Sequence, residues 1–405
     1  MFVIKIIIKK SIMFNFHSLF KSSLCLFFIL TISCNVEHPI LDHGSSEIVE
    51  ELTVPFEDRY GAIIFEAEAN GSTNEFVFDS GAGVSLLEES FVKELGLETF
   101  FLTTGFDANK TEGDFFATVL NSFSIGNQTY MNYRPLVVPI EDQNWKCLGA
   151  QGIFGAFMMK NSVWKIDIKN RLLTSYKNSI DESRLNGYTK VPFTTDEYGI
   201  PKIKITINGK ELLYTVDLGS THGLDISTEE YIKISQSSDK ELVKGRGYNF
   251  AIFGNKLSDY SMYQIQSAVI GNITINNPVV RVKDKVSLKI GMDFFKNYES
   301  IFDWKREILY LKNTSDEKYS SEFSQIGFNF IDDKFIVSNV ADYSEDMQVS
   351  LDDEVLEIND QKIDQNTICD VLQSLYINKE MEVKIKYKNK DNEIKETNIT
   401  PYILL

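Results

Sequence analysis

Two aspartates in similar surroundings are the residues best suited to carry chemistry. Asp79 lies in the segment Phe-Val-Phe-Asp-Ser-Gly-Ala, and Asp217 lies in Tyr-Thr-Val-Asp-Leu-Gly-Ser. An Asn-Gly pair precedes each of them, with its asparagine nine positions before the aspartate, at 70 and at 208. Two facing carboxylates can supply an acid and a base, because like charges in close contact cannot easily both ionise and one proton is shared. The two segments therefore predict a carboxylate pair that activates water.

Other kinds of catalytic site find little support. Three of the four histidines precede the folded body, which leaves His222, expected in a loop, for any histidine-dependent site. There is no G-x-S-x-G elbow, no C-x-x-C pair and no His-rich zinc pattern. The glycine-rich pieces lack the third glycine of a dinucleotide-binding loop. We therefore expect neither a metal nor a cofactor.

The similarity around the aspartates belongs to a longer internal repeat. The stretch Gly-Ala-Phe-Met-Met-Lys-Asn from Gly155 is echoed by Gly-Met-Asp-Phe-Phe-Lys-Asn from Gly291, an offset of 136 residues. Twelve residues beyond each glycine lies another aspartate, Asp167 and Asp303, which we expect to begin polar turns. Such self-similarity indicates two homologous lobes.

Most of each lobe is expected to be β-sheet. Short alternating apolar runs separated by Gly, Asn and Asp predict strands. Asn-Gly between such runs is a strong hairpin signal, so each catalytic candidate should follow the second strand of a hairpin. The segments after Gly155 and Gly291 are the best helix candidates in the lobes.

These motifs resemble the retropepsin-like aspartic peptidases, in the form with two half-size lobes fused in one chain. That family places Asp-Thr/Ser-Gly on a loop after a hairpin, with a later hydrophobic-hydrophobic-Gly segment crossing behind it. Here Ile153-Phe154-Gly155 and Ile290-Gly291 match the later segment, with Lys289 in place of one apolar residue. The resemblance covers about residues 56–315.

The resemblance implies an aspartic endopeptidase in which Asp79 and Asp217 are catalytic. The residues expected to support the two loops are Ser80, Gly81, Ala82, Leu218, Gly219 and Ser220. In the family, the hydroxyl after each aspartate bonds across to the opposite loop. Ser80 can do this and Leu218 cannot, so the alternative is a catalytically inactive protein that binds peptides in the same cleft. The Ser220 hydroxyl could bond a carboxylate and favour its charged form.

Two segments are candidates for the hairpin flap that closes over substrate in this family, Thr104–Phe115 and Gly245–Tyr260. Their position and their glycine and aromatic residues favour this reading. The alternative is a pair of ordinary surface hairpins.

The C-terminal segment resembles a bacterial PDZ domain. Leu-Asp-Asp-Glu-Val-Leu-Glu-Ile-Asn-Asp from Leu351 approximates the strand-and-turn signature of that family, with Asp352 and Asp360 where glycines are usual. The resemblance implies a loop of Gly327, Phe328 and Asn329 that holds the terminal carboxylate of a peptide ligand. The alternative is a small α/β unit that only packs against the lobes.

The N-terminus predicts export. Lysines precede the apolar run Leu24–Ile32, which is too short to span a bilayer, and Ser33-Cys34 then resembles a lipoprotein box. We expect lipidation at Cys34 and a periplasmic or cell-surface location; the alternative is an ordinary cleaved signal. Cys147 and Cys369 lie far apart in different segments, so we expect no disulfide and a buried or partly buried thiol at Cys147.

These observations predict a mainly β protein with five parts. They are a signal peptide at 1–34, a tether at 35–55, lobes at 56–185 and 186–315, and a linker with a PDZ-like α/β domain at 316–405. The net charge of −17 argues against nucleic acid as a partner. The expected partners are a peptide or protein substrate, a C-terminal peptide ligand, and the membrane through the N-terminal lipid only.

Overall fold

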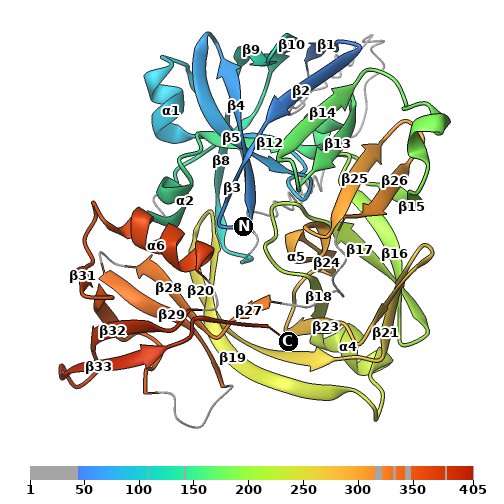
Figure 1. The fold of residues 1–405 in the computed structure, drawn as a ribbon. Helices are drawn as coiled ribbons and strands as arrows, with labels where there is room; N and C mark the ends of the chain where they lie inside the picture. Colours follow the sequence, from blue (N-terminus) through green and yellow to red (C-terminus); the bar gives the residue numbers. More distant parts are fainter. Residues whose placement is uncertain are drawn as a thin grey trace, which may run out of the picture.

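A computed structural model of the protein describes residues 44–107, 109–140, 143–314, 322–331, 334–342, 348–378 and 381–404. Strands dominate, which confirms the prediction of a mainly β protein (Figure 1). The predicted signal segment, Cys34 and the first part of the tether, up to residue 43, lie outside the described residues. Within the described ranges, no helix combines the length and the apolar character needed to cross a bilayer.

The first lobe is one curled sheet with the strand order β1-β10-β9-β4-β5-β12-β6-β11-β8-β7, and β3 pairs with β4. Its strands are β1 (Ser45–Glu47), β3 (Glu57–Arg59), β4 (Ala62–Ala69), β5 (Ser72–Asp79), β6 (Leu86–Glu88), β7 (Thr99–Phe106), β8 (Glu112–Thr118), β9 (Leu120–Ile125), β10 (Gln128–Tyr133), β11 (Leu136–Val138) and β12 (Gly152–Gly155). Its helices are α1 (Glu89–Glu94), α2 (Gln143–Leu148) and α3 (Ala156–Met159).

The second lobe repeats the central part of this arrangement. Its strands are β16 (Pro201–Ile207), β17 (Lys210–Val216), β18 (Leu224–Ser227), β19 (Lys240–Ala251), β20 (Gly254–Gln264), β21 (Ser267–Ile270), β22 (Ile273–Asn276), β23 (Val279–Lys283) and β24 (Lys289–Ile290). Its helices are α4 (Thr228–Ile234) and α5 (Met292–Phe295). The helices α3 and α5 begin directly after Gly155 and Gly291, as predicted.

Both predicted Asn-Gly turns form hairpins, β4–β5 and β16–β17. Asn70 and Gly71 have φ angles of 49° and 86°, and Asn208 and Gly209 have 49° and 80°. Positive φ at both central residues is what a type I′ turn requires, and Asn-Gly meets this requirement with little strain. Each hairpin delivers one aspartate to the end of its second strand.

Six strands join the lobes, in the order β2-β14-β13-β25-β26-β15, and β15 continues into the second lobe by pairing with β16. These strands are β2 (Glu51–Pro55), β13 (Val163–Asp167), β14 (Leu172–Tyr176), β15 (Thr189–Thr195), β25 (Tyr298–Asp303) and β26 (Ile308–Asn313); the short helix η1 (Glu182–Leu185) precedes β15. At the centre of the six Lys165 pairs with Ile301, and 165 + 136 = 301, so equivalent repeat positions face each other. This is the register that a two-fold relation between the lobes produces.

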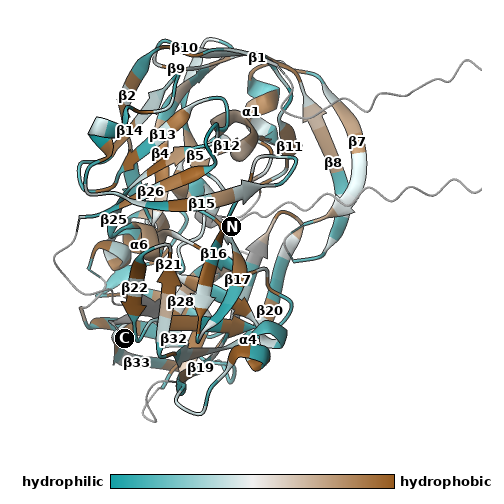
Figure 2. Ribbon diagram, turned by 90° about the vertical axis from the view of Figure 1, so that its right-hand side faces the viewer, coloured by the Kyte–Doolittle hydropathy of each residue, from teal (hydrophilic) through white to brown (hydrophobic). Residues whose placement is uncertain are grey.

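The core behind the first aspartate is aromatic. Phe78, next to Asp79, stacks on Phe154 with ring centroids 5.8 Å apart and meets Trp164 edge-on at 5.2 Å. These rings are fully buried. Figure 2 shows hydrophobic and hydrophilic residues alternating along the strands, as expected for sheets with one buried face. The packed core therefore fixes the strand that carries Asp79.

The C-terminal unit is a smaller α/β arrangement. It contains β27 (Glu322–Ser324), β28 (Ile326–Ile331), β29 (Lys334–Asp342), β30 (Glu354–Ile358), β31 (Gln361–Lys362), α6 (Ile368–Ile377), β32 (Val383–Lys388), β33 (Ile394–Ile399) and β34 (Tyr402–Leu404). Its strand β29 pairs with β19 of the second lobe, where Asn339 lies opposite Gly247. The unit, at the lower left of Figure 1, therefore adds its strands to a sheet of the second lobe.

Two predictions that involve this unit are wrong. Gly327, Phe328 and Asn329 do not form a loop: they lie in β28, paired with β29. Cys147 is not a free thiol, because it forms a disulfide with Cys369 across 222 positions of sequence. The strand pairing of β28 and the packing of α2 against α6 bring these distant parts together, which sequence spacing alone does not reveal.

Candidate active site

The two predicted aspartate loops meet at the junction of the lobes. The Asp79 and Asp217 side chains are both buried, with exposed fractions of 1% and 0%. Gly81 lies against the Asp217 carboxylate and Gly219 against that of Asp79, so closely that a Cβ at either glycine would overlap the opposing carboxyl group. The structure thus brings together the two carboxylates that the sequence singled out.

Each loop is held from behind by its later glycine segment, as the resemblance implied. Strand β12 runs parallel to β5 with Gly155 beside Asp79, and β24 runs parallel to β17. The amide of the residue after each of these glycines donates to the loop: Ala156 N to Ala82 O at 2.8 Å, and Met292 N to Ser220 O at 2.6 Å. The backbones of the two loops are therefore fixed in equivalent ways.

One hydroxyl links the two loops. Ser80 Oγ donates to Val216 O at 2.9 Å and accepts from Leu218 N at 3.1 Å. Leu218 offers no hydroxyl for the reciprocal pair of bonds; its side chain is 1% exposed and packs in the core. The predicted asymmetry is therefore present, with the serine linking both loops from one side.

The Ser220 hydroxyl does not act as expected. It is buried, and among the described residues it has no hydrogen-bond partner. The sequence suggested that it would contact a carboxylate. Backbone amides donate to the carboxylate instead: Asp79 Oδ1 accepts from Gly81 N at 2.7 Å and from Gly219 N at 3.1 Å.

The electrostatic environment of the pair is unequal. Burial raises the pKa of Asp79, and the charge of the neighbouring Asp217 raises it further, against the two amide hydrogen bonds and the more weakly acting Lys289. The ammonium of Lys289 lies 3.5 Å from Asp217 Oδ2. Asp217 Oδ1 is buried and accepts no hydrogen bond within the described part of the chain. The arrangement can hold one proton on the Asp79 side and a negative charge on the Asp217 side.

Both predicted flap segments form hairpins, and their tips touch. The hairpin β7–β8 contributes Asp107, whose Oδ2 accepts from Phe253 N at 2.9 Å, and Asn109, whose amide donates to Asn249 O at 2.9 Å. The Phe115 and Phe253 rings lie 5.1 Å apart, edge to face. Contacts between the tips link the two lobes a second time, apart from the six strands that join them.

The other residues weighed in the sequence lie mostly in structural roles. Asp167 and Asp303 end β13 and β25 and accept from the amides of Asn170 and Arg306, so their assignment to turns is confirmed. His222 is exposed, and its Nε2 lies 2.6 Å from an Arg281 nitrogen. In the described ranges, no group of three or more metal-ligating side chains occurs.

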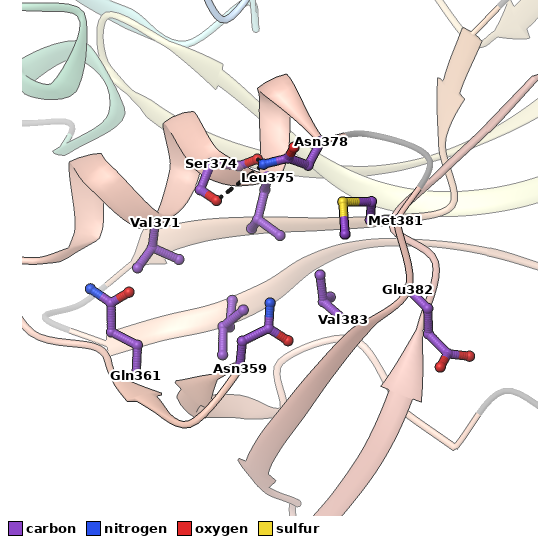
Figure 3. Close-up of a pocket in the computed structure, with 10 residues that line it drawn as sticks. Asn359, Gln361, Val371, Ser374, Leu375, Asn378, Met381, Glu382 and Val383 are labelled. Atoms are coloured by element: carbon purple, nitrogen blue, oxygen red, sulfur yellow. Dashed lines mark hydrogen bonds between the residues drawn. The ribbon is translucent and has the colours of Figure 1, made fainter.

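The C-terminal unit presents a small pocket away from the aspartates (Figure 3). It lies between α6 and the start of β32, where Val371, Leu375 and Val383 form an apolar floor beside Asn359. The residues predicted to hold a peptide carboxylate line no part of it. Instead, α2 of the first lobe packs against β28, the strand that contains them.

Comparisons with known proteins point to one class. Residues 65–156, which include Asp79 and Gly155, match the aspartyl protease family model, and this match covers less than a quarter of the 405 residues. No curated protein matches the chain.

Solved structures of two proteases are among those similar to this chain. The aspartic proteinase from Irpex lacteus is 12% identical, with a TM-score of 0.38, and the match covers 65% of this chain and 98% of that one. The retropepsin-like aspartic protease from Rickettsia conorii is 22% identical, with a TM-score of 0.25, and the match covers 33% of this chain and 94% of that one. The family-model match, over residues 65–156, is what makes the segment around the first aspartate similar to aspartyl proteases.

Proposed function

We propose that the protein is an aspartic endopeptidase that hydrolyses peptide bonds with water held between Asp79 and Asp217. The observation that carries this proposal is the meeting of two buried carboxylates on equivalent loops, each glycine lying against the opposite carboxylate. The family match around Asp79 supports the same class of chemistry.

The geometry suggests how the two carboxylates share the work. Asp79 Oδ1 already accepts two amide hydrogen bonds, so the shared proton is held on Oδ2, where it can donate to the scissile carbonyl. Asp217, beside the Lys289 ammonium, carries the negative charge, and its unpartnered Oδ1 draws a proton from the attacking water. The hydroxide adds to the carbonyl carbon, and the proton taken by Asp217 then passes to the leaving amine.

The experiment is digestion of a peptide library by the protein purified without its first 34 residues, beside the Asp79→Asn variant. A pH range of about 3 to 7.5 covers the titration of carboxylates. Cleavage by the parent alone is expected. Equal cleavage by the parent and the variant would refute the assignment, because a carboxamide in place of the Asp79 carboxyl group can neither hold nor release the proton.

A second candidate is a catalytically inactive protein that binds peptides at the same place. Two observations support this candidate. Leu218 has no hydroxyl to bond across to the opposite loop. Lys289 forms an ion pair with Asp217, one of the two proposed catalytic carboxylates. A parent that binds peptides, loses binding on the Asp79→Asn change and cleaves nothing at any pH would favour this candidate.

For the C-terminal unit, we propose that it holds the β19–β20 hairpin in place. Tyr260 on the hairpin donates to Asn339 Oδ1 at 3.0 Å, Tyr248 donates to Asp352 Oδ1 at 2.8 Å, and β19 pairs with β29. This supports the alternative of a unit that packs on the lobes, over capture of a C-terminal peptide. Tyr248→Phe should raise the hydrogen-exchange rate of the hairpin amides; an unchanged rate would contradict the proposal.

We also propose that the protein is exported and lipid-anchored at Cys34. The disulfide supports an oxidising compartment, since such bonds persist mainly outside the cytosol. Metabolic labelling with a fatty acid should mark the parent and leave Cys34→Ser unlabelled. Equal labelling of both would rule out this anchor.

A further inference from the structure

The sheet beside Asp79 presents an apolar face. Leu86 pairs with Leu136 on one side and with Ile153 on the other. Val138, two residues beyond Leu136, completes the set, and all four side chains are buried in one apolar cluster. We call these four residues the apolar face.

The equivalent face beside the second aspartate is charged. In the same register, Asp225 pairs with Arg281 on one side and with Lys289 on the other. Lys283, two residues beyond Arg281, takes the place of the valine. We call these four residues the charged face. The two lobes thus have the same strand pairing at these positions, but the first lobe carries four apolar side chains there and the second carries three cations and one anion.

The charged face lies between the aspartate pair and the β19–β20 hairpin. At one end, Lys289 Nζ is 3.5 Å from Asp217 Oδ2. At the other, Lys283 Nζ donates to the side-chain oxygen of Asn249, close to the hairpin tip. A peptide bound at the carboxylates would pass directly along this face.

The positive charges on the face are not fully balanced. Arg281 is matched by Asp225 through two hydrogen bonds of 2.8 and 2.7 Å. Although burial disfavours the charged form, the Arg281 charge lowers the pKa of Asp225 to about 2, so this carboxylate remains ionised. Lys283 is different. It is 8% exposed, and no carboxylate oxygen among the described residues lies within 4.0 Å of its nitrogen.

An unmatched buried ammonium costs free energy, and an anion beside it would recover that cost. The pKa of Lys283 reflects the imbalance: burial first, and then the charges of Arg281 and Lys289, lower it to about 7, against the favourable charge of Asp225. Its only hydrogen-bond acceptor in the described structure is the neutral Asn249 amide oxygen.

We propose that Lys283, with Lys289 beside it, forms a subsite for an acidic side chain of the peptide substrate, close to the scissile bond. The carboxylate of a substrate Glu or Asp replaces the Asn249 oxygen as the acceptor for Lys283. This proposal rests on the proposed peptidase function.

The test compares peptides that differ only in Glu or its neutral isostere Gln, scanned through the positions flanking the bond cleaved. At about pH 5.5 glutamate is ionised. At one position, kcat/KM for Glu should exceed that for Gln by about tenfold or more, as expected for a buried charge pair. In Lys283→Met this ratio should fall to about one. Lys204→Met is the matched control, because Lys204 is 69% exposed and pairs with Glu211, and its ratio should match the parent's.

Binding of the same peptides to the Asp79→Asn protein, followed by fluorescence anisotropy, separates the two proposals. Cleavage of Glu and Gln peptides at equal rates at every position overturns the subsite and leaves the peptidase function standing. Absence of cleavage, together with tighter binding of the Glu peptide that Lys283→Met abolishes, supports the subsite and overturns the peptidase function. Equal binding of both peptides overturns the subsite in either case.

Discussion

Lys289 stands where the resemblance leads one to expect an apolar residue, and replacing it should move the pH range of activity. Its ammonium is 3.5 Å from Asp217 Oδ2, and its side chain is only 14% exposed, so solvent screens the pair weakly. Two unit charges at this distance interact by about 5 kcal/mol at an effective dielectric constant of about 20. At about 1.4 kcal/mol per pH unit, this sets an upper bound of roughly 3.5 units on the shift.

The direction in which the pH profile moves depends on which protonation state of the aspartate pair the Lys289 cation stabilises. The positive charge lowers the pKa of Asp79, because it stabilises the form of the pair that has lost its shared proton. Lys289→Met removes that charge, so the proton is held to higher pH. We expect the basic limb of the profile to rise by about one to two units, below the upper bound because the cation contacts only one of two coupled carboxylates.

The assay is kcat/KM against pH for a peptide without acidic side chains, so that the charged face does not affect binding of the substrate. Lys289→Arg retains the charge and should retain the parent profile. Lys204→Met controls for loss of a distant surface charge. If Lys289→Met leaves the basic limb where the parent has it, the ion pair with Asp217 does not control the shared proton, and the reasoning is wrong.

Three further changes test the frame around the site. Ser80→Ala leaves two buried backbone groups, Val216 C=O and Leu218 N–H, without a partner and should lower stability by about 3 kcal/mol; a melting temperature equal to the parent's would contradict this. Leu218→Thr supplies the missing hydroxyl but loses apolar burial, and should lower stability by about 1–2 kcal/mol; a gain in denaturant resistance would refute the estimate. Replacing Cys147 and Cys369 with Ser should cost about 5 kcal/mol in the chain-entropy account of a loop spanning 222 positions, measured by urea unfolding; a midpoint insensitive to both the substitutions and reductant would rule this out.

The repeat explains why so much of the lobes could be predicted from the sequence. Asn-Gly turns specify local hairpin geometry, and a motif that occurs twice at one offset predicts both its structure and a two-fold relation. The short helices after Gly155 and Gly291 were predicted from the same local repeat. These signals act within a few residues of chain.

The features that were missed depend on contacts between distant segments. The disulfide requires α2 to lie against α6, and the strand position of Gly327 depends on pairing with β29. The charged face was visible only in part: Lys289 departed from the expected pattern, but Arg281 and Lys283 carry no motif. A comparison of the two repeats strand by strand would have found them, since the same register carries apolar residues in the first lobe.

The disulfide also has a consequence for the order of biosynthesis. Cys147 emerges from the ribosome 222 residues before its partner, an interval on the order of ten to forty seconds at usual elongation rates. The complete second lobe lies within the ring that this bond closes. The first lobe therefore keeps Cys147 unpaired until the segment that carries Cys369 has been made, and a chain that ends before residue 369 cannot form this bond.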